Sequence, residues 1–259
     1  MNNIKTIAWH TLICWIRNKV YIGFIAASFL LIAFAFICAN ITGLFQERVF
    51  VDSSIFFIEL ISIITAVFIC STTVIKDIQS KEIYYILSRP ISKFQFLTGR
   101  FLGLTICVIA LHLLITALFT LITSLYGFEL TQKMKLYFFL VISLKIILVC
   151  SFSFVFSTYS TSFFPALILS FTLFFIFEFS ESMNYWLTFY SQTAVFMKPV
   201  YNFLFLIMPN LVYYDIFYMF DINKFASLSS YTGFLALYTF IYSILFLIIS
   251  LISFNKRSL

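Results

Sequence analysis

Four ionisable residues lie inside long apolar runs of the chain: Glu59, His112, Lys145 and Glu178. A lysine at the centre of a membrane-crossing helix costs about 2.5–3.5 kcal/mol on insertion scales, so Lys145 should face protein or water. We expect Lys145 to pair with Glu59, with Glu178 as the competing partner. Such a group either locks helices together or contacts a substrate within the membrane. His112 is better explained as a hydrogen-bonded packing residue.

Catalytic and metal chemistry are not indicated by the remaining residues. The two histidines, His10 and His112, are far apart, and the five cysteines form neither a C-x-x-C motif nor a pair with metal-ligand spacing. None of the many serines has an evident base. The six glycines do not form a phosphate-binding loop of the G-x-x-x-x-G-K-(S/T) type. We therefore expect no enzyme, no metal site and no cofactor on this chain.

The composition indicates a membrane protein. Hydrophobic residues make up 63% of the 259 residues and charged residues only 10%, whereas soluble domains carry about 25% charged residues. The formal charge of +6 is spread over loops, so nucleic-acid binding is not expected. The prediction is an all-α, polytopic fold in a single transmembrane domain, 1–259. Its six spans are predicted at 20–42, 55–75, 101–126, 136–156, 163–179 and 231–254.

A polar insert, residues 76–100, separates the second and third spans and carries five of the sixteen basic residues. Asp77 is predicted to cap a short helix that begins near Ile78. Pro90 should end that helix, because a proline pushes the preceding residue, Arg89, into an extended conformation. The apolar residues of the helix, which share one face at helical spacing, are Ile83, Ile86 and Leu87.

The insert leads into the third span through two further signals. Ser92 and Gln95 have the spacing of a capping box, in which each side chain binds the backbone N–H of the other residue. Gly99 and Gly103 form a G-x-x-x-G pattern, which indicates close helix packing at the start of the span. We therefore expect the insert to contain a short amphipathic helix, a kink and a new helix start.

Two segments are predicted to lie at the membrane surface. Residues 1–19 form an amphipathic pattern with Trp9 and Trp15 placed for the headgroup region, typical of an interfacial helix. Residues 180–230 contain a proline-bracketed apolar stretch, 200–208, that is too short to cross, among many aromatic residues. We interpret 180–230 as short re-entrant helices in the outer leaflet followed by a surface segment. A plain interfacial anchor is the alternative for each segment.

The distribution of basic residues predicts the orientation. Ten lie on the side that holds the two termini and the 76–100 insert, five lie on the other side, and Lys145 lies within a span. Because positive residues are enriched in cytoplasmic loops, the N- and C-termini and the insert are expected in the cytoplasm.

The motifs of the insert occur in a familiar order. An acidic residue, Asp77, precedes Glu82, then the segment Leu87-Ser88-Arg89-Pro90-Ile91-Ser92-Lys93 and then Gly99-Arg100-Phe101-Leu102-Gly103. This order resembles the first intracellular loop of permease subunits of ATP-binding-cassette (ABC) transporters of the second export type. The chain departs from the family pattern after Glu82, where Ile83 and Tyr84 replace a common glycine, and at Lys93, where arginine is common.

The resemblance implies that the short helix is a coupling helix that docks on a cytoplasmic ABC ATPase. It implies two ATPase copies, which hold ATP and Mg, and two permeases joined as a homodimer or as a heterodimer with a related chain. The expected location is a bacterial plasma (inner) membrane, and the expected activity is export, with a lipid-like or amphiphilic cargo suggested by the aromatic-rich composition. The coupling residues it implies are Asp77, Lys81, Glu82, Ile83, Ile86, Leu87, Arg89 and Pro90.

Two other functions remain open at this point. An ion-gradient-driven secondary transporter would commonly show internal repeats with broken helices, and no convincing repeat relates residues 1–126 to 127–259. A non-transporting membrane scaffold is the other alternative, and the polar insert would then need another partner.

Overall fold

The computed structural model describes residues 2–17, 19–43, 46–88, 91–127, 132–180, 208–215 and 228–256, which contain helices and no strand. The prediction of an all-α fold is confirmed for these residues. The elements, in chain order, are α1 (Asn2–Arg17), α2 (Val20–Thr42), α3 (Gln46–Gln79), α4 (Glu82–Leu87), α5 (Lys93–Leu125), α6 (Gln132–Tyr159), α7 (Phe163–Glu178), the 3₁₀ helix η2 (Leu211–Tyr214) and α11 (Leu228–Asn255).

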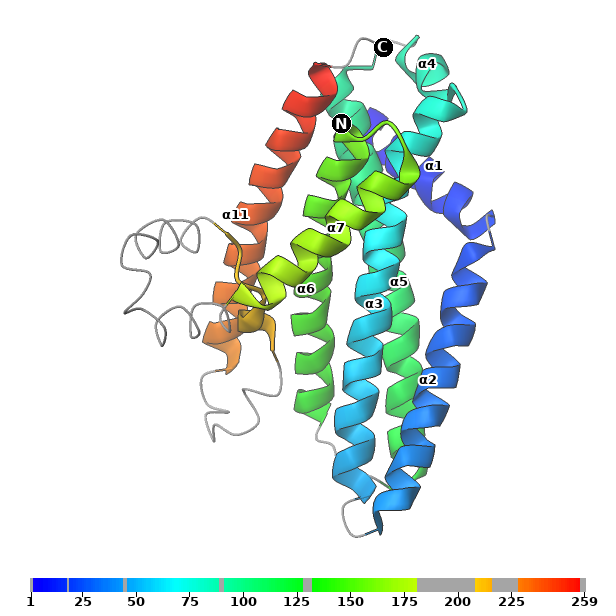
Figure 1. Ribbon diagram of the computed structural model, residues 1–259, viewed down its shortest axis with the longest axis vertical. Coiled ribbons are helices and arrows are strands. Elements are labelled where there is room, and N and C mark those ends of the chain that lie inside the picture. The colour runs from blue at the N-terminus through cyan, green and yellow to red at the C-terminus, as the bar shows by residue number, and fades with distance from the viewer. Residues whose placement is uncertain are drawn as a thin grey trace, which may run out of the picture.

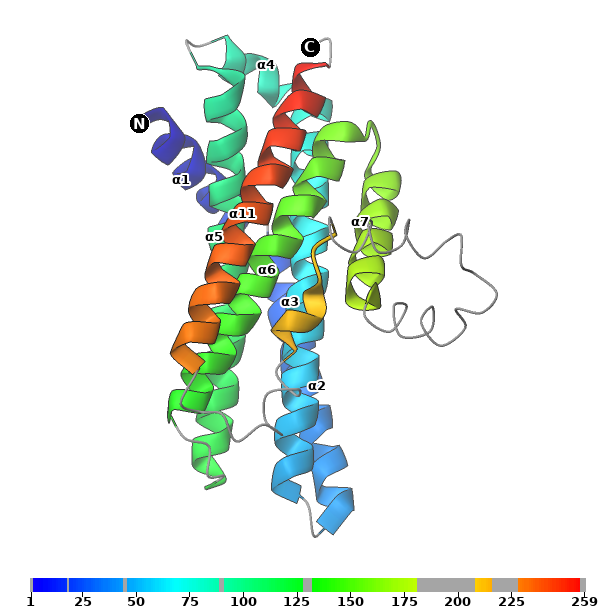
Figure 2. The same cartoon turned by 90° about the vertical axis from the view of Figure 1, so that its left-hand side faces the viewer.

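Five of these helices, α2, α3, α5, α6 and α11, are long and apolar enough to cross a membrane. They run side by side along the long axis of the molecule (Figures 1 and 2). The expected fifth span, 163–179, corresponds to α7, which has 16 residues and is therefore about 24 Å long. A typical hydrocarbon core is about 30 Å thick. Within the described residues the structure thus supports five spans, and α7 crosses the bundle obliquely as a shorter helix (Figure 1).

Several helices are longer than the spans predicted from hydropathy. α3 begins at Gln46 and ends at Gln79, so Glu47, Arg48 and Asp52, which lie between the predicted spans 20–42 and 55–75, are helical. α6 likewise continues to Tyr159, past the end of the predicted span 136–156. Hydropathy marks where apolar side chains stop, whereas backbone hydrogen bonding continues until a cap or a helix-breaking residue intervenes.

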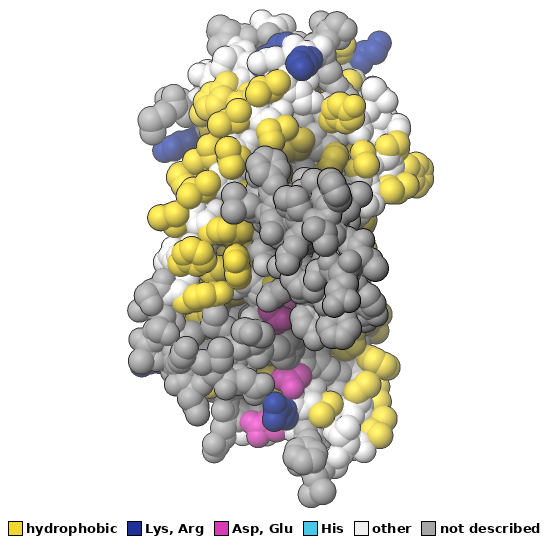
Figure 3. Space-filling view, turned by 60° about the vertical axis from the view of Figure 1, so that its left-hand side comes forward, with side chains coloured by type: hydrophobic (Ala, Val, Ile, Leu, Met, Phe, Trp, Pro, Cys, Tyr) yellow, Lys and Arg dark blue, Asp and Glu magenta, His cyan; other side chains and the backbone are white. Residues whose placement is uncertain are grey.

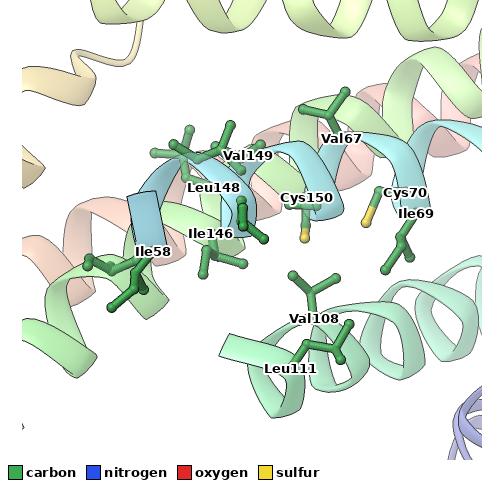
Figure 4. Close-up of a cluster of buried hydrophobic side chains, with 14 of the residues drawn as sticks. Ile58, Val67, Ile69, Cys70, Val108, Leu111, Ile146, Leu148, Val149 and Cys150 are labelled. Carbon is green, nitrogen blue, oxygen red and sulfur yellow. The ribbon is translucent and has the colours of Figure 1, made fainter. Parts of the chain in front are cut away.

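The core lies between α3, α5 and α6, whose apolar side chains point into a shared interior (Figure 4). Large apolar side chains are also exposed on the outside, among them Leu30 and Phe240, which are 67% and 66% exposed. Figure 3 shows hydrophobic side chains over much of one face and most of the visible basic side chains near the end that carries α4. An apolar exterior of this kind is suited to lipid.

The first residues of α1, the end of α11 and the short helix α4 lie toward the same end of the bundle (Figures 1 and 2). α1 lies obliquely beside the bundle, where it packs mainly on α5. The start of α1, the end of α11 and the described part of the insert thus share one side of the bundle, which we call the α4 end.

Candidate functional site

At Asp77 the structure of the insert differs from the prediction. α3 does not end before this residue but continues to Gln79, so Asp77 caps no helix and is buried in the last turn of α3. The chain then turns at Lys81, whose φ of 60° is left-handed, and α4 begins at Glu82. The predicted cap is therefore wrong, because Asp77 has a distant partner that local sequence rules do not include.

That partner is Arg100, which forms the centre of a buried polar network at the α4 end. Its Nη2 donates to Asp77 Oδ1 at 3.0 Å, and its Nε lies 2.9 Å from Asp77 Oδ2. Its Nη1 donates to the hydroxyl oxygen of Thr11 at 3.1 Å, and Nη2 lies 3.9 Å from Glu82 Oε2. Arg100 is 3% exposed and Asp77 6%. One guanidinium group thus connects α1, α3, α4 and α5.

Close helix packing places Thr11 within reach of Arg100. A Cβ added at Gly103 would lie 2.7 Å from Thr11 Cβ and 2.8 Å from the carbonyl oxygen of Ala8, and one added at Gly99 would lie 2.9 Å from Ile7 Cβ. The glycines therefore allow α1 and α5 to touch backbone to backbone. The role of Gly99 and Gly103 in helix packing is as predicted, and their partner is the N-terminal helix.

Replacing Gly103 with alanine should weaken the α1–α5 contact. Because the new methyl group would overlap Thr11 and the Ala8 carbonyl, we expect a loss of about 1–3 kcal/mol in the free energy of unfolding. Gly23→Ala on α2 is the matched control, since no atom lies within 4 Å of its Cβ position. Thermal unfolding of the purified chain in detergent would measure both, and equal effects would contradict the packing argument.

The predicted apolar face of α4 is partly used within the protein itself. Ile83 is 0% exposed and belongs to the core, and Ile86 packs partly against that core. Among the side chains at α4 that the structure describes, the exposed ones are instead Lys81, Glu82, Tyr84 and Ser88. The side chain of Leu87, and all of Arg89 and Pro90, lie outside the described residues.

The start of α5 agrees with its prediction. The Gln95 N–H donates to Ser92 Oγ at 3.2 Å, and the Ser92 N–H donates to Gln95 Oε1 at 3.3 Å. The two bonds form a complete capping box. They fix the first turn of α5, and thereby the direction in which Arg100 leaves the helix two turns later.

Three of the four intramembrane ionisable residues form a second polar centre, halfway along the bundle. Lys145 lies at the middle of α6 and is 1% exposed. Its Nζ is hydrogen-bonded to Glu59 Oε1 on α3 and to Glu178 Oε1, at 2.9 Å, on the last residue of α7. The predicted Lys145–Glu59 pair is confirmed, and Glu178 is a simultaneous partner rather than a competitor. We call Glu59, Lys145 and Glu178 the charged triad.

His112 lies apart from the triad's ion pairs. Its Nδ1 is 3.0 Å from Ser62 Oγ, and its ring stacks on Phe139 at 5.5 Å and 9°. It is 1% exposed. These contacts agree with the prediction of a hydrogen-bonded packing residue between α3, α5 and α6.

Most of the expected re-entrant segment, 181–207 and 216–227, lies outside the described residues. The part between them is attached to α11. The Asn210 N–H donates to Tyr238 Oη at 2.8 Å, and Asn210 Oδ1 accepts from the Val212 N–H to cap η2. Tyr214 is hydrogen-bonded to Thr239 at 2.7 Å. Residues 208–215 are therefore hydrogen-bonded to α11, and η2 also packs against α7.

Sequence reasoning did not single out Arg100 or Thr11 as site residues. One signal pointed to Arg100: an acidic residue at the end of one span and a basic residue at the start of the next face the same membrane surface. Thr11 gave no comparable signal, because its role depends on how α1 docks.

Comparison with known proteins gives one finding. A family model described as "ABC-2 family transporter protein" matches residues 5–259, nearly the whole chain. No curated protein is significantly similar to the chain.

Proposed function

Because this chain belongs to the ABC-2 family of transporter proteins, we propose that it is the membrane-spanning permease subunit of an ATP-driven transporter, coupled through α4 to a separate ATPase. The observation that carries the proposal is the buried Arg100 network. It joins α1, α3 and α5 beside α4, whose Glu82 lies 3.9 Å from the guanidinium group and whose Ile83 is buried in the core. A short helix held in this way, with polar residues exposed, is suited to receive motion from a partner.

The contacts suggest how such motion would pass into the bundle. Glu82 on α4 contacts the same guanidinium group that Asp77 and Thr11 bind. A displacement of α4 would reach the buried Arg100–Asp77 pair, and with it α3, α5 and α1, through Glu82. That contact is the weaker one, because the Glu82 side chain is 58% exposed. Ile83, buried in the core, adds a packed contact to the polar one. In this proposal α4 and the helix ends around it move as a unit.

The remaining features follow the family and are part of the proposal. Two permeases, identical or related, combine with two ATPases, which supply the ATP and Mg sites. The α4 end faces the cytoplasm of a bacterial cell, and ATP binding reorients the spans to export a lipid-like or amphiphilic cargo. On α4, the exposed Lys81, Glu82 and Tyr84 form the contact with the ATPase, with Arg89 and Pro90 following in the chain.

A mild-detergent pull-down of the tagged chain from its native cell tests this assignment. We expect one soluble ATPase per permease among the co-purifying proteins, and loss of that ATPase on charge reversal of Glu82 together with Arg89. A chain that purifies alone, or with membrane proteins only, would favour a gradient-driven carrier or a scaffold instead.

Tyr84→Ala should weaken ATPase binding without unfolding the permease. Tyr84 is 50% exposed on α4, and tyrosines are common hot spots at protein interfaces. We expect at least a tenfold loss of affinity, about 1.4 kcal/mol, in a titration of the purified permease with its ATPase. Tyr126→Ala is the control, since Tyr126 is 57% exposed at the end of α5 away from α4. An equal loss for both variants would place the interface elsewhere.

A further inference from the structure

The charged triad holds more negative than positive charge. Lys145 contacts both Glu59 and Glu178 through one ammonium group. With all three side chains ionised, two carboxylates against one ammonium leave a net charge of −1. The other ion pairs among the described residues include neither Glu59 nor Glu178. Among the described residues, the triad therefore lacks one positive charge at a depth where an unbalanced charge is costly.

The elements packed against α7 do not supply that charge. They are α3, α6 and η2. From α3 and α6 come Glu59 and Lys145, which belong to the triad. Directly after η2, Asp215 is close enough to interact electrostatically with Glu178 and to repel it. Tyr214 on η2 is uncharged at neutral pH. The described elements around Glu178 thus increase the excess of negative charge.

Within the triad, Glu178 is the residue placed to accept a positive charge. Its Oε1 accepts from Lys145, whereas Oε2 is enclosed and has no hydrogen-bond partner among the described residues. The Glu178 side chain is also the most accessible of the three, at 30% exposed against 16% for Glu59 and 1% for Lys145. A buried carboxylate oxygen without a partner is unfavourable, and a neutral carboxyl group removes most of that cost.

We propose that Glu178 binds one proton inside the bundle, so that the triad consists of a protonated Glu178, an ionised Glu59 and an ionised Lys145. The proton is transferred from a hydronium ion to Oε2, which leaves a water molecule and makes the triad electrically neutral. Glu178 is the last residue of α7, so its deprotonation places an unbalanced charge where α7 meets α3 and α6. The contact of α7 with the bundle then depends on proton concentration.

Infrared spectroscopy of the purified full-length chain in lipid nanodiscs tests the proposal without any ATPase, and so independently of the proposed function. The C=O stretch of a protonated carboxyl group is separate from the carboxylate bands. At neutral pH we expect wild type to show a protonated carboxyl band that Glu178→Gln removes. Glu59→Gln should remove the same band, because Lys145 alone then balances Glu178. Glu47→Gln, at an exposed carboxylate, should leave the band unchanged.

Two results would overturn the proposal. A band that survives in Glu178→Gln would place the proton on another residue. A wild-type spectrum without any band that depends on the triad would mean that all three residues are ionised and that another cation balances them. If Glu178→Gln fails to fold, loss of the band in Glu59→Gln carries the test, and its persistence there contradicts the charge argument.

Discussion

Replacing Arg100 with leucine should lower the free energy of unfolding by about 3–5 kcal/mol, because it leaves Asp77 buried without its ion-pair partner. Asp77 is 6% exposed and takes both of its ion-pair contacts from this guanidinium group. The same change removes the hydrogen bond to Thr11, which should loosen α1. Denaturant unfolding in detergent, followed by tryptophan fluorescence, measures both effects, since α1 contains Trp9 and Trp15.

The exposed pair Arg48–Asp52 provides the matched control. Its side chains are 79% and 47% exposed, and exposed ion pairs contribute about 0–1 kcal/mol. Arg48→Leu should therefore have little effect. The double variant Arg100→Leu with Asp77→Asn should recover part of the lost stability, because no carboxylate then remains buried and unpaired. Equal losses of unfolding free energy in Arg48→Leu and Arg100→Leu would show that burial does not determine how much an ion pair contributes to stability.

Features that depend on neighbouring residues were predictable from the sequence. The capping box of Ser92 and Gln95 requires only a spacing of three residues, and both of its hydrogen bonds are present. The five long spans required only continuous apolar runs. The Gly99-x-x-x-Gly103 pattern indicated close packing, because absence of a Cβ at two positions one turn apart creates a flat surface whatever helix covers it.

Features that depend on distant partners were not predictable in the same way. Asp77 satisfied the rule for an N-cap, yet it binds Arg100, 23 residues later in the chain. Ile83 had the spacing of an exposed docking face, yet the turn at Lys81 directs α4 so that Ile83 enters the core. Sequence rules for caps and helix faces consider only residues that are close in the chain. They do not include an interaction that forms only after several helices have assembled.

The charged triad lies between these two cases. The cost of a central lysine predicted that Lys145 must find carboxylates, and only Glu59 and Glu178 were candidates. Hydropathy could not show that both would bind at once, because that depends on α7 ending beside α3 and α6. The length of α7, 16 residues, is what places the carboxylate of its last residue at the depth of Lys145.

Replacing Lys145 with methionine should be the most damaging single change within the membrane. Methionine is an unbranched side chain only one heavy atom shorter than lysine and carries no charge, so two glutamates are left buried without an ammonium partner. Breaking a buried ion pair in this way costs about 3–5 kcal/mol. We expect a corresponding loss in unfolding experiments in detergent and a lower yield of inserted protein. Lys133→Met is the control, because Lys133 is exposed at the start of the same helix and should tolerate the change.

The triple variant Lys145→Met, Glu59→Gln, Glu178→Gln separates the two roles that remain open for the triad. Replacing every charge removes the unpaired carboxylates, so stability should return to within about 1–2 kcal/mol of wild type. If transport also returns, the triad only locks α3, α6 and α7 together. If stability returns and transport does not, the charges act on the substrate or on the transport step itself. Unchanged stability and transport in Lys145→Met alone would contradict both roles.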